Sequence, residues 1–270
     1  MLIDYHTHLE NGPYTMEWLQ RFVDQARAAG LAEIGITEHG HRFVVAQGIV
    51  DNDIVRGWGG QDVDTYVKLV EDAKQAGWPV KLGLEMDYVP GKEKEIAAFL
   101  AAYPWDYVIG SVHWDGDFSL DLPVHKPEWE RRGIDNVYRR YFELVRAAAT
   151  SGLFDVMGHA DLVKIYGYRP SSAFDLEEEY QATAAAFAKA GVAVEVSTAG
   201  LRRPVGEIYP AAGFLAACHA LGVPVTLASD AHRPEDVGFA IEGAVSWARA
   251  CGYDELVTFD GRRPRRAPLG

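Results

Sequence analysis

A short apolar run rich in β-forming residues, a polar loop and a longer stretch with helical periodicity follow one another along nearly the whole chain. The apolar runs predict strands at residues 2–5, 33–37, 80–85, 107–112, 155–158, 192–197 and 223–228. The periodic stretches predict helices at residues 15–29, 62–76, 92–102, 136–151, 176–190, 209–220 and 234–250. Several of these helices end in a glycine directly before the next apolar run, the usual position of a C-terminal cap. The alternation predicts parallel strands joined by right-handed helical crossovers.

The number of repeats decides between two kinds of parallel sheet. About seven units in 270 residues favour an α/β barrel of TIM type over an open, doubly wound sheet. No phosphate-binding GxGxxG follows the first apolar run, which disfavours a nucleotide-binding open sheet. Because no linker and no shift in composition divides the chain, we predict a single domain over residues 1–270.

Charge and hydropathy narrow the classes of partner. The formal net charge of -13 disfavours nucleic acid and anionic membranes, because the long-range field repels both. No window approaches the roughly 18 uninterrupted apolar residues of a membrane span. The cysteines, Cys218 and Cys251, lie in alanine-rich stretches and suit a reducing compartment. We predict a cytoplasmic protein of unspecified oligomeric state that acts on a small molecule, with the Arg-rich tail GRRPRRAPLG as a solvated end.

Potential metal ligands stand at the end of nearly every predicted strand. In parallel α/β barrels these strand ends form one face, so the side chains are expected to converge. His6 and His8 are two residues apart, which places both imidazoles on one side of an extended backbone. Such a set exceeds the ligand number of one tetrahedral ion, and it predicts two or three divalent ions, Zn, Mn or Fe, bridged by a carboxylate. The candidate ligands are His6, His8, His39, Glu85, His113, His159, Asp230 and His232.

Basic residues gather in two loops on the same predicted face of an otherwise acidic protein. The loops HADLVKIYGYRP and STAGLRRP contribute Lys164, Arg169, Arg202 and Arg203. Guanidinium pairs bind phosphate oxygens in a bidentate manner, so these residues are candidate substrate ligands for a small anionic phosphate ester. The alternative is ion pairing with nearby Glu177, Glu178 or Glu207. His41, in a loop on this face, is either a further substrate contact or a solvated loop residue.

The ordered motifs resemble those of the polymerase and histidinol phosphatase (PHP) superfamily. HxH, then EH, Glu85, GSVH, GH and SDAH occur in the family's order within residues 2–232. The stretches SGLFDVMGHADL and TAGLRRPVGEIYP are similar to the stand-alone histidinol-phosphatases of that superfamily. The resemblance implies a distorted (β/α)7 barrel with a multinuclear metal centre, commonly trinuclear, and hydrolysis of L-histidinol phosphate by hydroxide attack in line at phosphorus.

The resemblance also implies roles for individual residues. One ion would be held by His6, His8, Glu85 and Asp230, a second by Glu85, His113 and His159, and a third in part by His39 and His232. Arg169 and Arg202 would bind the phosphate, and with Asp230 and His232 they are the candidate catalytic residues.

One ligand position of the family pattern is absent. A His or Asp is usual about eight residues after the first histidine, where this chain has Tyr14, and Glu10 or Glu17 could substitute. Three alternatives to histidinol-phosphatase stay open: a PHP phosphoesterase for another phosphate ester or nucleotide, a C–N hydrolase of the amidohydrolase kind, and a non-catalytic metal-binding protein. The amidohydrolase pattern wants a bridging lysine late in a strand, whereas Lys81 begins a predicted strand and Lys164 lies beyond one.

Overall fold

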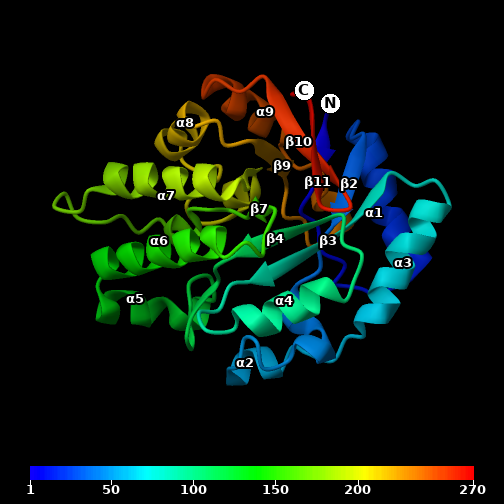
Figure 1. Cartoon of the computed structure of the whole chain (residues 1–270), viewed down its shortest axis with the longest axis horizontal. Coiled ribbons are helices and arrows are strands. Elements are labelled where there is room, and N and C mark those ends of the chain that lie inside the picture. The colour runs from blue at the N-terminus through cyan, green and yellow to red at the C-terminus, as the bar shows by residue number, and fades with distance from the viewer.

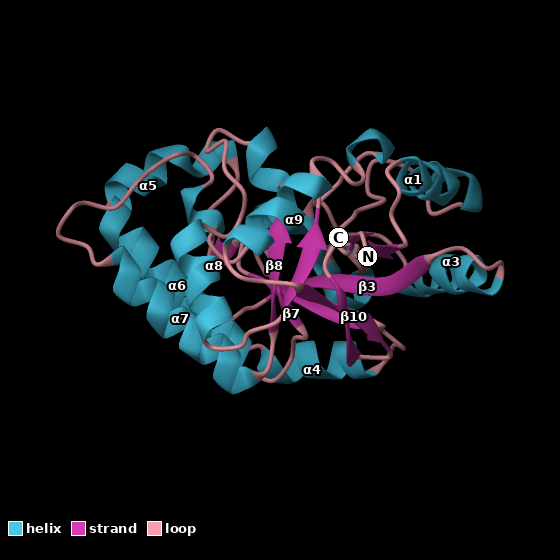
Figure 2. Ribbon diagram, turned by 90° about the horizontal axis from the view of Figure 1, so that it is seen from above, coloured by secondary structure: helices cyan, strands magenta, loops and turns pink.

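A seven-stranded parallel sheet forms the centre of the computed structural model, which describes residues 1–270 (Figures 1 and 2). The strands are β1 (Ile3–Asp4), β2 (Glu33–Ile36), β3 (Val80–Asp87), β4 (Tyr107–Ser111), β7 (Val156–Met157), β8 (Ala193–Ser197) and β9 (Val225–Ala228), in that spatial order. The backbone N–H of Tyr5 donates to the Leu227 carbonyl over 2.9 Å, and Thr7 forms a parallel bridge with Ala231. Because β9 thereby returns to β1, the sheet nearly closes, and the predicted distorted (β/α)7 barrel is confirmed.

Helices surround this sheet, as Figure 2 shows. They are α1 (Met16–Ala28), α3 (Val63–Gln75), α4 (Glu93–Ala101), α6 (Ile134–Thr150), α7 (Leu176–Ala190), α8 (Ala212–Ala220) and α9 (Ile241–Ala250). Side-chain caps fix several starts, such as Thr15 before α1 and Asp62 before α3. The predictions for 209–220 and 234–250 began too early, because Tyr209 pairs with Ser197 and Pro234–Asp236 is a separate 3₁₀ turn. None of the helices combines the length and apolarity needed to cross a bilayer.

Two long connections on the carboxyl side of the sheet contain short elements that the periodicity did not predict. Helix α2 (Asp53–Arg56) lies between β2 and α3. The hairpin of β5 (Trp114–Asp115) and β6 (Phe118–Ser119), followed by α5 (Lys126–Arg132), lies between β4 and α6. Elements of two to seven residues are too short to establish a hydrophobic period. These connections build much of the cavity described below.

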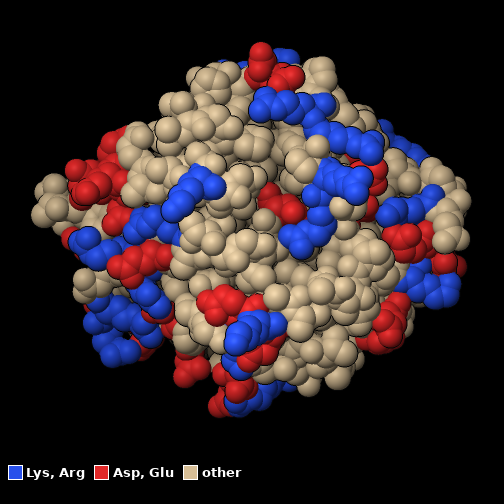
Figure 3. All heavy atoms as spheres, viewed as in Figure 1, with Lys and Arg blue, Asp and Glu red and all other residues tan.

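The Arg-rich tail is an ordered strand that is exposed over most of its length, in line with the predicted solvated end. β11 (Arg263–Pro268) pairs antiparallel with β10 (Glu255–Asp260), and Figure 3 shows Lys and Arg side chains gathered where Figure 1 draws this hairpin. At the turn, Arg262 Nε donates to Asp155 Oδ2 over 2.8 Å, and its backbone N–H donates to the Asp106 carbonyl over 2.7 Å. Asp106 and Asp155 directly precede β4 and β7, so the hairpin covers the amino-terminal end of the barrel.

Aromatic rings fill the interior of the barrel below the carboxyl ends of its strands. Tyr5 and Tyr107 stack with ring centroids 4.8 Å apart, and the Tyr107 hydroxyl donates to the Tyr5 carbonyl over 2.6 Å. A β-carbon on Gly35 would lie 1.6 Å from that hydroxyl oxygen, so the position requires glycine. These rings belong to one continuous cluster of 79 buried hydrophobic residues. The carboxyl ends of the strands therefore rest on a closely packed support.

Candidate metal centre

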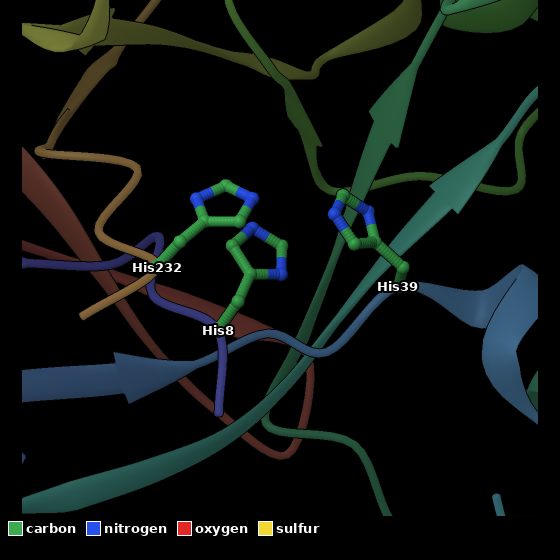
Figure 4. Close-up of side chains that lie close together, drawn as sticks. All are labelled: His8, His39 and His232. Atoms are coloured by element: carbon green, nitrogen blue, oxygen red, sulfur yellow. The ribbon is translucent and has the colours of Figure 1, made fainter. Parts of the chain in front are cut away.

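The carboxyl ends of the strands bring all the predicted metal ligands to one face of the barrel. Each ligand comes from the end of β3 or from the loop directly after β1, β2, β4, β7 or β9: His6, His8, His39, Glu85, His113, His159, Asp230 and His232. Figure 4 shows His8, His39 and His232 facing one another from three separate segments. The His8 ring centroid lies 4.1 Å from that of His39 and 4.4 Å from that of His232.

Glu85 is the centre of the array. Its Oε2 lies 3.3 Å from His6 Nε2 and 3.6 Å from His8 Nε2. Its Oε1 lies 3.0 Å from His159 Nε2 and 3.6 Å from His113 Nε2. The two oxygens thus face different groups of histidines, the arrangement expected of a carboxylate that bridges two ions.

Donor atoms form three groups whose members all lie within 4.8 Å of one another: His6, His8 and Asp230; His6, Glu85 and His159; and His8, His39 and His232. The first group contains three of the four ligands predicted for the first ion, all except Glu85. The second contains Glu85 and His159 of the predicted second ion, and His113 joins it through Glu85. The third adds His8 to the predicted pair of His39 and His232.

The chemistry of the buried donor atoms fits metal ions. Buried nitrogen and oxygen atoms are costly without a partner, and native structures leave few of them. Here His6 Nε2, His8 Nε2 and Glu85 Oε2 are buried without a hydrogen bond. These atoms lie close to one another among the residues of the three groups, so ions of the Zn, Mn or Fe class would satisfy donors that the protein itself leaves open.

The charged side chains of this array shift one another's pKa values. Burial alone would raise the pKa of Glu85, but the imidazoles of His6, His39 and His113 hold it well below its ordinary range. Burial would lower the pKa of His8, but Asp230 and Glu38 more than reverse this and raise it to about 9. Burial and the neighbouring His8 lower the pKa of His39 to about 4. The carboxylates are therefore held ionised, as metal ligands must be.

Two of the ligands have unusual backbone conformations. His159 has a φ of 26° and Asp230 a φ of 54°, a region that non-glycine residues seldom adopt. Arg202 holds the second of these loops, since its Nη2 donates to the carbonyls of Ser229 and Asp230 over 2.6 and 3.0 Å. The tertiary contacts thus impose the backbone geometry that aims Asp230 at His8.

Outer carboxylates orient the ligand histidines, and the sequence analysis did not identify their roles. Glu195 Oε2 lies 2.7 Å from His6 Nδ1, and its Oε1 accepts the His159 backbone N–H over 3.0 Å. Asp87 Oδ1 lies 2.9 Å from His113 Nδ1. A carboxylate on the second ring nitrogen fixes the tautomer of a ligand histidine. The sequence contains a signal for each residue. Glu195 is a charged residue inside the otherwise apolar strand β8, and Asp87 stands with Glu85 at the end of β3.

The chain lacks the usual ligand of the family pattern near Tyr14, and Glu10 is the acidic residue of this segment that faces the histidines. Glu10 Oε1 lies 3.6 Å from His232 Nε2, and its Oε2 lies 3.9 Å from His39 Nε2. These separations are too long for hydrogen bonds but suit donors that share one ion. Glu17 is exposed on α1, and the Tyr14 hydroxyl instead donates to Glu38 Oε2 over 2.9 Å. Of the two substitutes that the sequence allowed, only Glu10 lies in the centre.

Two adjoining cavities open onto the array. The wider has a volume of about 400 Å³ and is lined in part by His39, His41, His113 and His232. The smaller, about 60 Å³, reaches Glu85, His159 and Asp230. The side chain of Arg203 lines both cavities and has no acidic partner within 4.0 Å.

The other three predicted phosphate ligands do not line these cavities, so their role stays a prediction. Arg169 Nη2 lies 2.6 Å from Glu207 Oε1, the ion pair that was its alternative. Lys164 is buried, and its Nζ lies 3.0 Å from Asp161 Oδ2. Arg202 is engaged with backbone carbonyls, as described above. Neither cavity is lined by any of these three, whereas His41 lines the wider one, 3.3 Å from Asp87. The way the loops pack decides that Arg203, and not the other three basic residues, lines the cavities. The sequence pattern does not specify this packing.

Comparison with known proteins agrees with this architecture. The chain is 43% identical over 185 residues to a probable histidinol-phosphatase of Deinococcus radiodurans, covering 68% of this chain and 69% of the relative. It is 25% identical over 266 residues to the histidinol-phosphatase of Lactococcus lactis, covering 97% and 95%. The crystal structure of the Lactococcus lactis histidinol phosphate phosphatase, complexed with zinc, L-histidinol and phosphate, matches with a TM-score of 0.79 at 24% identity and covers 98% of both chains.

The family profile of the PHP domain matches residues 4–199. This range runs from the last residue of β1 to just beyond β8, and it contains the loops with candidate ligands that follow β1, β2, β4 and β7. With the barrel closed by β9 and the remaining ligands carried after it, the chain belongs to the PHP domain family.

Proposed function

We propose that this protein, with residues 1–270 acting as one domain, hydrolyses L-histidinol phosphate to L-histidinol and phosphate in the cytoplasm. The observation that carries the proposal is the convergence of unsatisfied histidine and carboxylate donors beside the unpaired Arg203. The relatives named histidinol-phosphatase support the choice of substrate. In the reaction the P–O ester bond breaks, water supplies the hydroxyl to phosphorus, and a proton passes to the alcohol.

The ligand groups would hold two or three divalent ions. His6, His8 and Asp230 would hold one ion, Glu85 and His159 with His113 a second, and His39, His232 and Glu10 a third. Such ions supply Lewis-acid stabilisation of the phosphoryl oxygens and hydroxide at neutral pH. Glu195 and Asp87 keep the histidine rings in place, so the donor geometry is set before substrate arrives.

The protein's own contribution to binding the phosphate would come from Arg203. Its guanidinium lines both cavities, next to His159 in the smaller one and His232 in both. Planar guanidinium groups bind two phosphate oxygens at once, which orients the ester and offsets its charge. This local cation is needed because the protein as a whole carries a net charge of -13. Asp230 and His232, which the sequence analysis named as catalytic, would act here as ligands beside the bound phosphate.

A substrate panel tests the proposed reaction. Purified protein loaded with Zn or Mn is expected to hydrolyse L-histidinol phosphate with a kcat/KM at least about 100-fold above those of nucleotides and sugar phosphates, since a shaped site gains tenfold for each 1.4 kcal/mol of selective contact. Release of inorganic phosphate is the measurement. Equal turnover across the panel would point to a PHP phosphoesterase of other specificity. Amide substrates serve as the control for a C–N hydrolase, for which the bridging lysine late in a strand is missing: Lys81 is the second residue of β3, and Lys164 pairs with Asp161.

Replacing Glu10 by glutamine tests the third ion. The variant keeps the side-chain volume but removes the charge between His39 and His232, so we expect the metal content to fall by about one ion per chain. Activity is expected to fall about 10–100-fold, as for outer ligands of metal sites. Elemental analysis after gel filtration measures the ions directly. Glu17→Gln on the exposed face of α1 is the matched control and should keep the full content; unchanged metal content in Glu10→Gln would remove Glu10 from the centre.

A further inference from the structure

The wall of the wider cavity carries a second charged group besides Arg203 that lacks an ion-pair partner. Asp121 lines this cavity, and it also lines the smaller cavity at the metal centre. It follows the β5–β6 hairpin, whose first strand begins directly after His113. The cavity therefore has the free guanidinium of Arg203 and a carboxylate among its lining groups, together with the indoles of Trp58 and Trp114.

The Asp121 carboxylate is held in place but not neutralised. Its Oδ1 accepts a hydrogen bond from the Ser119 hydroxyl over 2.6 Å, and its backbone carbonyl accepts one from the Tyr166 hydroxyl. Its Oδ2 has no hydrogen bond, and no Lys, Arg or His nitrogen lies within 4.0 Å of the carboxylate. By contrast, the other carboxylate and guanidinium on this wall, Glu10 and Arg42, pair with each other over 3.0 Å. Asp121 and Arg203 are thus two opposite charges that lack ion-pair partners in the protein.

An unpaired carboxylate is unfavourable in a cavity for a plain phosphate ester, because it repels the doubly charged phosphate. A substrate that carries a cation a few bonds from its phosphate removes this cost, since each end then meets the opposite charge. We propose that Asp121 binds the ammonium group of an amino alcohol phosphate and so selects such esters over uncharged alcohol phosphates. This assignment deepens the proposed function, because L-histidinol phosphate carries a primary ammonium group.

The two indoles complete this subsite. The ring centroids of Trp58 and Trp114 lie 6.3 Å apart, and Trp58 is 37% exposed although it is a large apolar side chain. Aromatic walls pack against a flat ring and also favour a nearby cation. They therefore suit the imidazole of the same substrate, next to the ammonium group on Asp121.

Asp121→Asn tests the assignment in the metal-loaded protein, because asparagine keeps the shape and the hydrogen bond with Ser119 but removes the charge. Two substrate pairs that differ only in the amine are compared: L-histidinol phosphate with its analogue lacking the amino group, and phosphoethanolamine with ethyl phosphate. For the amine-bearing member of each pair we expect kcat/KM to fall about 10–100-fold, which is the usual effect of losing a hydrogen bond to a charged group. The change should appear mainly in KM. For the amine-free member we expect less than about a threefold change.

Asp117→Asn is the matched control, because Asp117 is an exposed carboxylate in the turn of the same hairpin and lines neither cavity. It should leave both pairs unchanged, which separates a specific contact from general electrostatics. Asp121→Glu should recover part of the discrimination. Equal losses on amine-bearing and amine-free esters in Asp121→Asn would overturn the assignment. Failure of the proposed function is a separate result: wild-type protein would then hydrolyse p-nitrophenyl phosphate without preferring L-histidinol phosphate, and the phosphoethanolamine pair would still decide the role of Asp121.

Discussion

Glu85→Gln is expected to lower kcat at least about 1,000-fold, more than the roughly 10–100-fold that outer residues of a metal site cost. Glu85 is the residue whose two oxygens face separate groups of histidines, with His6 and His8 on one side and His113 and His159 on the other. A carboxamide has nearly the same size but cannot bridge two cations as an anion. The loss should therefore appear in metal content as well as in turnover, and both are measured on the same preparation.

The fold of the Glu85→Gln variant should persist, because Glu85 lies on the rim of the barrel above the packed tyrosines. Far-ultraviolet circular dichroism and the elution volume check this point. Glu95→Gln, an exposed glutamate on α4, is the control for a general effect of charge. A Glu85→Gln protein that kept its full metal content and a tenth or more of its activity would contradict the bridging role.

Arg203→Ala is expected to lower kcat/KM about 100- to 1,000-fold, the range for removal of one fixed donor to a developing oxyanion. The reason is positional: Arg203 lines both cavities without an acidic partner. Arg203→Lys should recover only part of the activity, because an ammonium group cannot make the bidentate contact. Steady-state kinetics on L-histidinol phosphate, with inhibition by inorganic phosphate as a second readout, measures the effect.

Arg169→Ala tests whether the phosphate is bound by the residue that the family resemblance implies or by Arg203, which lines the cavities. Arg169 is 44% exposed and pairs with Glu207 over 2.6 Å, so its removal should change kcat/KM less than about threefold, as for other surface ion pairs. If Arg169→Ala cost as much as Arg203→Ala, the phosphate ligand implied by the family resemblance would stand, and the loop would have to rearrange when substrate binds.

The sequence by itself determined the barrel and the convergence of the candidate metal ligands on one face. The alternation of strands and helices requires parallel strands, and parallel strands carry the residues at their carboxyl ends to one face. His6 and His8 needed only the period of two of an extended chain to point the same way. For these residues, local pattern and fold topology are sufficient, since a ligand at a strand end converges whatever the loops do.

Only the tertiary structure decided which of the remaining candidates lie at the site. Arg202 and Arg203 are adjacent in the chain, yet one holds the backbone of Asp230 and the other lines the cavity. Arg202 is the last residue of a 3₁₀ turn and Arg203 follows it, so the direction of each side chain depends on how this turn packs. Glu10 meets His39 and His232 through a loop that has no periodic pattern. Such contacts join residues far apart in sequence, and their geometry is set by how loops pack against one another, which the order of residue types does not encode locally.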